Sequence, residues 1–318
     1  MDILFIADPL DAFKIYKDTT FSMMAEAARR GHRIYACEPV EMALAGGAVD
    51  ARVRRIEIVA QHDHAGPTPW YRAEPAEITA LAHFDAVLMR KDPPFDMEYV
   101  TATWLLEHAE RQGARIFNKP RAIRDHSEKL AIGEFPQFVT PTLVTRDFKR
   151  LRAFHEEHGD IILKPLDGMG GMGIFRVRAD GMNLGAILET LGDNGARSVM
   201  AQKFIPAISE GDKRILLIGG RPVPFALARI PQGNEVRGNL AAGGLGVARP
   251  LSEHDLKIAE TLGPVLIERG LLLVGLDVIG ESLTEVNVTS PTCFREITEQ
   301  TGFDVPAMFI DALELAAA

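Results

Sequence analysis

The sequence predicts an α/β protein of two domains, with an N-terminal parallel α/β domain followed by a larger mixed domain. Short apolar runs alternate with helix-like segments up to about residue 117. Beyond about residue 120 the pattern changes to paired strands joined by glycine-rich turns. A length of 318 residues suits two domains. We therefore expect domains at 1–122 and 123–318.

The N-terminal domain is predicted from short strands separated by helices that end at glycines. The strands are Ile3–Ala7, Arg33–Cys37, Ala86–Met89 and Arg115–Phe117, and the helices are Thr19–Arg30 and Val100–Gln112. Such a pattern indicates a parallel sheet covered on both faces. Ligands bind beyond the carboxyl ends of the strands in these sheets. Asp8 and the polar turn Arg90–Pro94 lie at those ends.

The second domain is predicted from hairpins and three further helices. The strands are Asp160–Pro165, Ile174–Val177, Val199–Phe204, Lys213–Ile218, Val223–Arg229, Leu272–Ile279 and Leu283–Val288, and the helices are Asp147–His158, Gly181–Leu191 and Glu253–Arg269. Residues Pro231–Pro250 are expected to form one long loop. Loops beyond ~15 residues inside a domain are usually functional or disordered.

Composition excludes several classes of protein. Two cysteines, Cys37 and Cys293, are too few for a disulfide framework or a zinc cluster and fit a reducing compartment. No signal peptide or membrane-spanning run is recognised, so we expect a cytoplasmic protein with no membrane partner. A net charge of −9 disfavours nucleic acid but leaves room for a small anion in a local positive pocket. His62 and His64 are interpreted as surface residues.

A glycine-rich turn follows Lys164, between two strands. Four glycines lie within the six residues Gly168–Gly173. Glycine lets backbone N–H groups approach an anion and permits positive φ. No helix follows the run, which excludes a P-loop or dinucleotide fingerprint. We therefore predict a hairpin flap over a phosphate chain, and the alternative is a plain tight hairpin. Lys164 can meet a phosphate as a point charge or extend into solvent.

An oxygen-rich set of side chains is predicted on the last hairpin. Glu285 and Asn287 are two residues apart on one strand, so they share a face. Asp277, on the preceding strand, joins that face if the turn Gly280–Ser282 closes the hairpin. Two carboxylates and an amide carbonyl suit Mg²⁺ or Mn²⁺ shared with substrate phosphates. The alternative is a row of polar residues facing solvent.

A polar segment with glycines near both ends, which runs from the end of the preceding strand into the long loop, contains two arginines. Arg229 begins this segment and Arg237 lies inside it. Mobile glycines at both ends favour a lid that keeps water from a hydrolysable intermediate. The arginine forks can hold phosphoryl or carboxylate oxygens. An ordinary surface loop is the alternative.

The chain resembles the ATP-grasp superfamily and, within it, the bacterial glutathione synthetase family. The matching segments are Met89–Phe95, Ile162–Gly171, Ala228–Gly233, Arg237–Gly244 and Glu285–Thr292. The resemblance implies a pre-ATP-grasp domain followed by an ATP-grasp domain with a glycine-rich lid subdomain at about 123–195. It also implies a symmetric homotetramer. The chain departs from the family pattern at Leu245, where an arginine is common.

The resemblance also implies roles for individual residues. The ATP-binding residues implied are Lys129, Lys164, Gly168, Met169, Gly170, Gly171, Gln202, Lys203, Phe204, Ile205 and Asp212. The acceptor substrate is expected to meet Arg90, Lys91, Asp92, Asn239, Ser290 and Arg295. Arg214, Arg229 and Arg237 are the expected catalytic residues, and Asp277, Glu285 and Asn287 are expected to hold two Mg²⁺ or Mn²⁺ ions.

By this resemblance the expected reaction joins γ-glutamylcysteine to glycine while ATP is cleaved to ADP and phosphate. Phosphorylation converts the carboxylate into an acyl phosphate with a good leaving group, and positioning with charge neutralisation provides most of the catalysis. Two alternatives remain open. One is another ATP-grasp ligase, such as a D-alanine–D-alanine type. The other is a nucleotide-binding module without catalysis, which the complete trio of metal-binding side chains disfavours.

Overall fold

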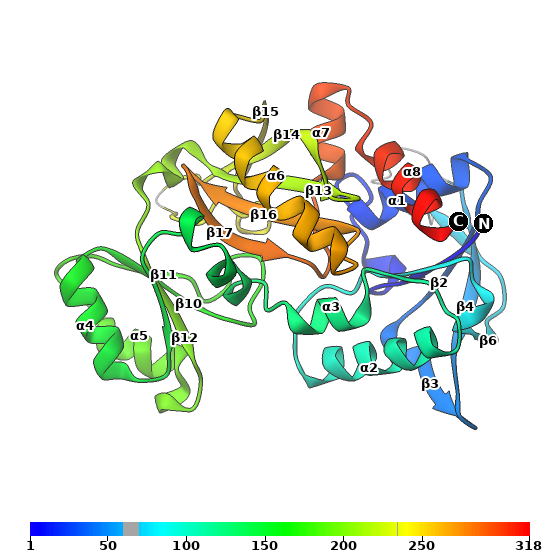
Figure 1. The fold of residues 1–318 in the computed structure, drawn as a ribbon, viewed down its shortest axis with the longest axis horizontal. Helices are drawn as coiled ribbons and strands as arrows, with labels where there is room; N and C mark the ends of the chain where they lie inside the picture. The colour runs from blue at the N-terminus through cyan, green and yellow to red at the C-terminus, as the bar shows by residue number, and fades with distance from the viewer. Residues whose placement is uncertain (60–69, 234) are drawn as a thin grey trace.

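The computed structural model describes residues 1–59, 70–233 and 235–318. Within these ranges the strands form three sheets that follow one another along the longest axis (Figure 1). The N-terminal sheet lies at one end, a five-stranded sheet lies in the middle, and a four-stranded sheet with two helices lies at the other end (Figure 1). The mixed α/β class predicted from the sequence is confirmed. His62 and His64 fall outside the described residues, as does Asn234 of the long loop.

Four parallel strands form the predicted core of the N-terminal sheet, in the order β2-β1-β7-β8. They are β1 Asp2–Ile6, β2 Arg33–Cys37, β7 Ala86–Met89 and β8 Ile116–Phe117. Helices α1 (Thr19–Arg29) and α2 (Met97–Arg111) begin at Asp18 and Asp96, whose carboxylates accept a backbone N–H of the first turn. The expected parallel arrangement is therefore present.

An antiparallel extension of this sheet was not predicted. It consists of β3 Met42–Ala45, β4 Ala48–Ile58, β5 Tyr71–Ala73 and β6 Glu77–Ala80. Strand β4 pairs with β2 on one side and also binds the three other strands. Only one face of its middle portion is buried, at Val49, Ala51 and Val53. Arginines and acidic residues fill the other face, so the segment has little apolar character by which to recognise it.

Side-chain alternation along β1 divides the core between two layers. Ile3 and Phe5 point to one face and Leu4 and Ile6 to the other. Helix α2 covers the second face. The first face is covered by α1 and by two C-terminal helices, α7 (Phe294–Thr301) and α8 (Val305–Ala317). The sequence analysis did not identify α7 or α8.

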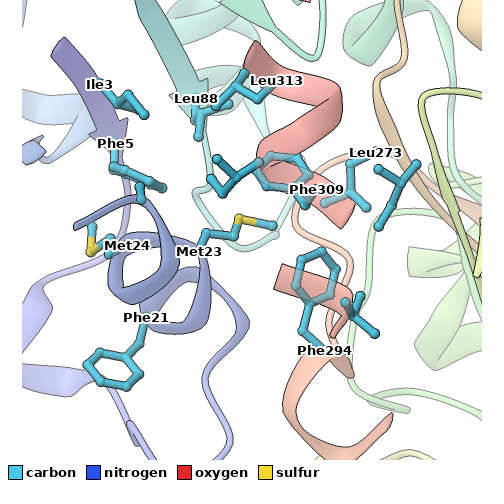
Figure 2. Packing of buried hydrophobic residues seen from close by; sticks show 14 of the residues in the cluster. Ile3, Phe5, Phe21, Met23, Met24, Leu88, Leu273, Phe294, Phe309 and Leu313 are labelled. Atoms are coloured by element: carbon cyan, nitrogen blue, oxygen red, sulfur yellow. The ribbon is translucent and has the colours of Figure 1, made fainter. Parts of the chain in front are cut away.

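The end of the chain thus returns to its beginning. Figure 2 shows Phe294 and Phe309 from α7 and α8 in the same apolar cluster as Phe5 and Met23. Arg30 of α1 forms ion pairs with α8, and the two termini lie side by side (Figure 1). The packing joins residues almost 300 positions apart in sequence.

The four-stranded sheet is fully antiparallel, in the order β11-β10-β12-β9. Its strands are β9 Thr142–Thr145, β10 Ile161–Pro165, β11 Phe175–Val177 and β12 Val199–Lys203, with helices α4 Phe148–His158 and α5 Leu184–Leu191. The core between this sheet and its helices is a separate small cluster that includes Leu151, Leu163 and Leu188. The predicted hairpin of β10 and β11 around the glycine run is present.

The five-stranded sheet is also antiparallel, in the order β15-β14-β13-β16-β17. Its strands are β13 Asp212–Ile218, β14 Arg221–Ile230, β15 Leu245–Pro250, β16 Leu273–Ile279 and β17 Ser282–Asn287. Helix α6 (Glu253–Glu268) and the segment around α3 (Pro120–Asp125) pack on it. The expectation of a loop throughout Pro231–Pro250 is wrong at its end, because residues 245–250 pair with β14.

Short 3-10 turns complete the described chain, at Leu10–Ala12, Pro39–Glu41, Leu81–His83, Leu130–Glu134, Pro136–Phe138, Asp193–Gly195, Pro206–Glu210 and Leu240–Ala242. The connection between the two predicted domains is held by Asn118. Its side-chain amide donates to the carbonyls of Leu273 (2.8 Å) and Val288 (2.9 Å) and accepts from the Leu273 N–H (2.9 Å). In the described ranges, no helix has the length and apolarity needed to cross a bilayer.

Candidate active site

The hairpin β16–β17 places three oxygen-bearing side chains on one face of the central sheet. Asp277 lies directly opposite Glu285 in the strand register, and Gly275 lies opposite Asn287. Residues directly opposite one another, and those two positions along a strand, share a face. The structure therefore brings Asp277, Glu285 and Asn287 together as the sequence analysis expected. Among the described residues, no three His, Cys, Asp or Glu side chains are grouped to hold a metal by themselves.

Asp277 is buried between two arginines from the neighbouring strands. Arg214 of β13 donates to both of its carboxylate oxygens, at 2.5 and 3.0 Å. Arg229 of β14 lies 2.9 Å from Oδ2 and also pairs with Asp212 at 2.6 Å. Burial opposes ionisation of Asp277, but the two guanidinium groups outweigh it and hold its pKa well below the usual range. Two predicted catalytic arginines thus contact one predicted metal ligand.

Glu285 is paired with Lys129, a residue of the segment before the four-stranded sheet. The Lys129 ammonium lies 2.8 Å from Glu285 Oε1 and 2.6 Å from the carbonyl oxygen of Gly168. Burial disfavours the ammonium, yet Glu285 outweighs that effect and raises the pKa of Lys129. These contacts join three sequence-distant parts of the predicted site: Lys129, the glycine run and the last hairpin.

A first cavity, which we call the nucleotide cavity, lies between the four-stranded and five-stranded sheets. All eleven residues predicted to bind ATP line it: Lys129, Lys164, Gly168, Met169, Gly170, Gly171, Gln202, Lys203, Phe204, Ile205 and Asp212. Lys164 is buried, and this burial lowers its pKa to about 8. Asp212 Oδ1 is buried without a hydrogen-bond partner among the described residues. The nucleotide cavity therefore contains both positively charged side chains and a carboxylate oxygen that is free to accept a hydrogen bond from a ligand.

Two glycine-containing loops meet over the nucleotide cavity. Gly171 has a φ of +83°, and a Cβ at this position would lie 2.8 Å from Asn239 Oδ1. Arg237 also packs against Gly171, while its guanidinium pairs with Glu235 at 2.8 Å. Gly238 approaches the carbonyl oxygen of Arg229 so closely that a Cβ would lie 2.1 Å away. Only glycine permits these approaches without displacement.

A second cavity, which we call the acceptor cavity, adjoins the first and has a volume of about 320 Å³. Met169, Gly170, Asn239 and Glu285 line both cavities. The predicted residues that line the second one are Asp92, Arg214, Arg229, Asn239, Glu285, Asn287 and Ser290. Ser290 donates to the Asp92 carboxylate and so joins the N-terminal domain to the turn after β17.

Three residues predicted to bind substrate line neither of these two cavities. Arg90 is buried and donates to Thr20 Oγ1 (3.1 Å) and to the carbonyl of Pro291 (3.0 Å). Lys91 pairs with Asp8 at 2.8 Å. Arg295 donates to the carbonyl of Ile15 and pairs with Glu299. Arg90 and Arg295 thus join segments next to the acceptor cavity, whereas Lys91 joins the turn after β7 to the residues after β1.

Glu128 is a site residue that the sequence analysis missed. Its Oε1 accepts from the N–H groups of Val288 (2.9 Å) and Thr289 (3.1 Å) and from Thr289 Oγ1 (2.8 Å). Its own carbonyl accepts from Val286 N at 2.8 Å. Burial, together with Glu285, raises its pKa. The only signal in the sequence is its place before Lys129, which does not reveal a partner 160 residues away.

The acceptor cavity is lined by further groups that sequence reasoning did not single out. They are Lys14, Lys17, Asp18 and Glu296, from the loop before α1 and from the first turn of α7. Because α7 was not predicted, no pattern indicated that these two segments would meet.

Family models match nearly the whole chain. The prokaryotic glutathione synthetase N-terminal domain matches residues 1–124, and the prokaryotic glutathione synthetase ATP-grasp domain matches residues 128–302. The chain belongs to the prokaryotic glutathione synthetase family. The resemblance inferred from the motifs is therefore confirmed.

Curated relatives that align with this chain over nearly their full length are named glutathione synthetase. The protein from Ralstonia nicotianae is 67% identical over 318 residues, which is 100% of this chain and 96% of the relative. The one from Bordetella parapertussis is 60% identical over 100% of both chains. The one from Neisseria meningitidis serogroup A is 59% identical over 98% of each.

Solved structures of more distant proteins share the fold. D-cycloserine synthetase DcsG aligns with a TM-score of 0.67 at 15% identity, covering 99% of this chain and 100% of that one. The ATP-grasp ligase PsnB, complexed with a minimal precursor, aligns with a TM-score of 0.63 at 20% identity, covering 100% and 99%. These two likenesses show that the chain shares its overall fold with these proteins, one of which is an ATP-grasp ligase.

Family membership confirms the predicted enzyme class and reaction. The chain is an ATP-dependent carboxylate–amine ligase, a glutathione synthetase by family, that joins γ-glutamylcysteine to glycine. ATP-grasp glutathione synthetases use divalent metal ions together with ATP.

Proposed function

We propose that ligation takes place where the nucleotide cavity meets the acceptor cavity, beside Glu285. The observation that carries this proposal is that Glu285 lines both cavities and lies opposite the buried Asp277, which pairs with Arg214 and Arg229 of the acceptor cavity. ATP occupies the nucleotide cavity and γ-glutamylcysteine occupies the acceptor cavity. The γ-phosphoryl group and the cysteine carboxylate then meet between them.

The nucleotide is held by complementary groups along its length. Strand β12 and the residues after it, Gln202–Ile205, bind adenine by their backbone and apolar side chains. Asp212 Oδ1, which has no hydrogen-bond partner among the described residues, accepts a hydrogen bond from a ribose hydroxyl. This bond removes the energetic cost of leaving a buried oxygen without a donor. Lys129, Lys164 and backbone N–H groups of Gly168–Gly171 bind the phosphates.

The last hairpin fits a divalent metal shared with the phosphates. Asp277, Glu285 and Asn287 offer oxygen ligands only, which suits Mg²⁺ or Mn²⁺, and their small number leaves positions for phosphate oxygens. We propose that they hold two such ions, which neutralise charge on the phosphates when bound. Lys129 and the arginines neutralise these carboxylates in the structure, so the hairpin carries little unpaired charge.

The arginines supply fixed positive charge to the reacting groups. Arg214 and Arg229 are buried and anchored, so their guanidinium groups need little reorganisation as charge develops. We assign them to the phosphoryl group during transfer and to the oxyanion formed when the glycine amine attacks the acyl phosphate. Arg237, from the loop over the nucleotide cavity, contributes to phosphate binding. Asp92, Asn239 and Ser290 bind the acceptor, and Arg90, Lys91 and Arg295 support the walls of its cavity.

When the two loops over the nucleotide cavity close, they exclude water from the acyl phosphate. The glycine run around Gly171 and the loop carrying Arg237 to Gly244 are proposed to open and close together, because they pack against each other. The domain division at 1–122 and 123–318, with a lid subdomain at about 123–195, remains part of this proposal. The strand β12 would move with that subdomain, since it pairs with β10 and β9.

We further propose that the enzyme is cytoplasmic and acts as a homotetramer, in keeping with the resemblance. Two measurements test the assembly and the reaction separately. Sedimentation gives the mass of the assembly. ADP release and glutathione formation are measured with γ-glutamylcysteine, glycine and Mg-ATP, omitting each in turn. Product should require all three, and paired D-alanine should give no dipeptide. Dipeptide formation from D-alanine would show that the enzyme is a different kind of ATP-grasp ligase.

A further inference from the structure

Glu296 places a buried, unused carboxylate oxygen at the wall of the acceptor cavity. The residue lies in the first turn of α7 and lines the cavity, and its Oε2 is buried without a partner among the described residues. Burial raises the pKa of this carboxyl. A buried carboxylate without a partner is costly, so a ligand that supplies a cation here gains more than a surface ion pair would.

The other carboxylates that line the cavity already have partners. Asp18 caps α1 by accepting from Phe21 N at 2.7 Å. Asp92 accepts from Ser290. Glu128 holds the end of β17, and Glu285 is paired with Lys129. Over the described ranges, Glu296 is thus the lining carboxylate with a buried oxygen left over.

Positive groups line the same cavity as Glu296, and Lys17 is close enough to act electrostatically on its carboxyl. Lys14 and Lys17 line it, and neither forms an ion pair with any of the described residues. Arg295 is engaged with Glu299 and with the carbonyl of Ile15. A ligand that carries a carboxylate and an ammonium on one carbon would match this combination of Glu296 with the two lysines.

Cys293 lines the same cavity as Glu296 and Arg214. Burial raises the pKa of the Cys293 thiol to about 11, the field of Arg214 opposes that rise, and the field of Glu296 adds to it. The thiol is therefore within electrostatic reach of both side chains. γ-Glutamylcysteine has the same polarity, since its reacting carboxylate and its free ammonium are at opposite ends of the molecule.

We propose that Glu296 binds the free ammonium group of the γ-glutamyl residue and thereby selects γ-glutamylcysteine over acyl-cysteines that lack this group. The inference rests on the proposed placement of the acceptor in this cavity. Glu296 takes no part in phosphoryl transfer, and its contribution is to binding and specificity.

The test compares two acceptors in two forms of the enzyme. Glutarylcysteine differs from γ-glutamylcysteine only by the absence of the ammonium. The full-length enzyme and Glu296→Gln are assayed for kcat/KM with each acceptor. If glutarylcysteine is not turned over, its inhibition constant against γ-glutamylcysteine replaces kcat/KM. Glu260→Gln, an exposed position on α6, removes the same charge far from the cavity and is the matched control.

The native enzyme should prefer γ-glutamylcysteine by about 30-fold, the size expected for a hydrogen bond to a charged group. Glu296→Gln should reduce that preference to within about threefold, without lowering performance on glutarylcysteine and without changing KM for glycine. Glu260→Gln should retain the full preference. A variant that loses activity equally on both acceptors, or that raises only KM for glycine, would overturn the proposal.

A separate variant distinguishes failure of this inference from failure of the placement of the acceptor. Ser290→Ala removes a side chain proposed to bind the acceptor at the other side of the cavity. If Ser290→Ala raises KM for γ-glutamylcysteine and Glu296→Gln leaves the preference unchanged, only the role of Glu296 is refuted. If neither variant alters acceptor kinetics, the cavity itself is not the acceptor site.

Discussion

The nucleotide cavity and the acceptor cavity are neighbours built in different ways. The nucleotide cavity takes its walls from β10, β12, the last hairpin and two glycine-containing loops, all after residue 128. The acceptor cavity gathers the loop before α1, the turn after β7, Glu128, three strands of the central sheet and the start of α7. The two meet at Glu285 and at the loop residues Met169, Gly170 and Asn239.

This difference shows which substrate can be recognised by short local motifs and which requires segments that are distant in sequence. A triphosphate is recognised by backbone N–H groups and lysines, which short motifs can supply. The acceptor has its own pattern of charges, and matching it requires side chains from segments that only tertiary packing brings together. The following predictions test this division, because each alters one cavity or the junction between them.

The largest effect is expected at the junction. Glu285→Gln keeps the side-chain shape but removes the charge that pairs with Lys129 and is proposed to bind metal. Ligation should fall by at least about 100-fold, since loss of a metal ligand exceeds the 10–100-fold effect of groups that only support ligands. Glutathione formation measures the loss, and thermal unfolding should remain cooperative. Near-normal turnover would refute the metal assignment. Glu281→Gln, exposed in the turn of the same hairpin, is the control and should behave as native.

Glu128 should matter through the strand that it holds. Its side chain and its carbonyl bind backbone N–H groups of Val286, Val288 and Thr289 and so fix the strand that carries Asn287. Glu128→Ala should raise the metal concentration for half-maximal rate by about 10–100-fold. Glu128→Gln retains an oxygen that accepts the same bonds and should restore most of the affinity. Equal losses in both variants would show that the charge itself is required.

The affinity for nucleotide is expected to depend on pH through a lysine of the nucleotide cavity. The pKa of Lys164 is lowered to about 8 by burial, so its ammonium is present below that pH and is lost as pH rises through it. Nucleotide affinity should therefore weaken by about tenfold between about pH 7 and pH 9. Calorimetric titration with ADP measures this change. In Lys164→Met the affinity should be lower throughout and nearly independent of pH over that range. A native enzyme with flat affinity would contradict the assignment.

The smallest effect is expected where the loops exclude water. Deleting Gln232–Gly244 should raise the ratio of ADP to glutathione several-fold, because water then reaches the acyl phosphate. Gly171→Ala is a milder test, since its Cβ would meet Asn239 and the residue requires a φ of +83°. It should raise the same ratio by a smaller factor. An unchanged ratio in both variants would mean that the loops do not protect the intermediate.

Much of the nucleotide cavity was predictable because its signals are local. The glycine run and the lysine before it lie within a few residues of each other. The last hairpin was predictable for the same reason, because Glu285 and Asn287 are two residues apart and the strand register adds Asp277. The resemblance implied that Arg90, Lys91 and Arg295 bind substrate, and this stays a prediction. The sequence did not reveal that the three side chains contact Pro291, Asp8 and Glu299.

By itself, the sequence determined the parallel N-terminal strands, the two-domain order, the family and the elements that are proposed to bind phosphate. Each of these depends on hydrophobic period or on residue spacing within one or two adjacent elements. Only the tertiary structure decided the antiparallel extension around β4, the return of α7 and α8 to α1, and hence the acceptor cavity with Glu296. These depend on contacts between segments as much as 284 residues apart, for which side-chain packing and buried charge select the partners and no local pattern exists.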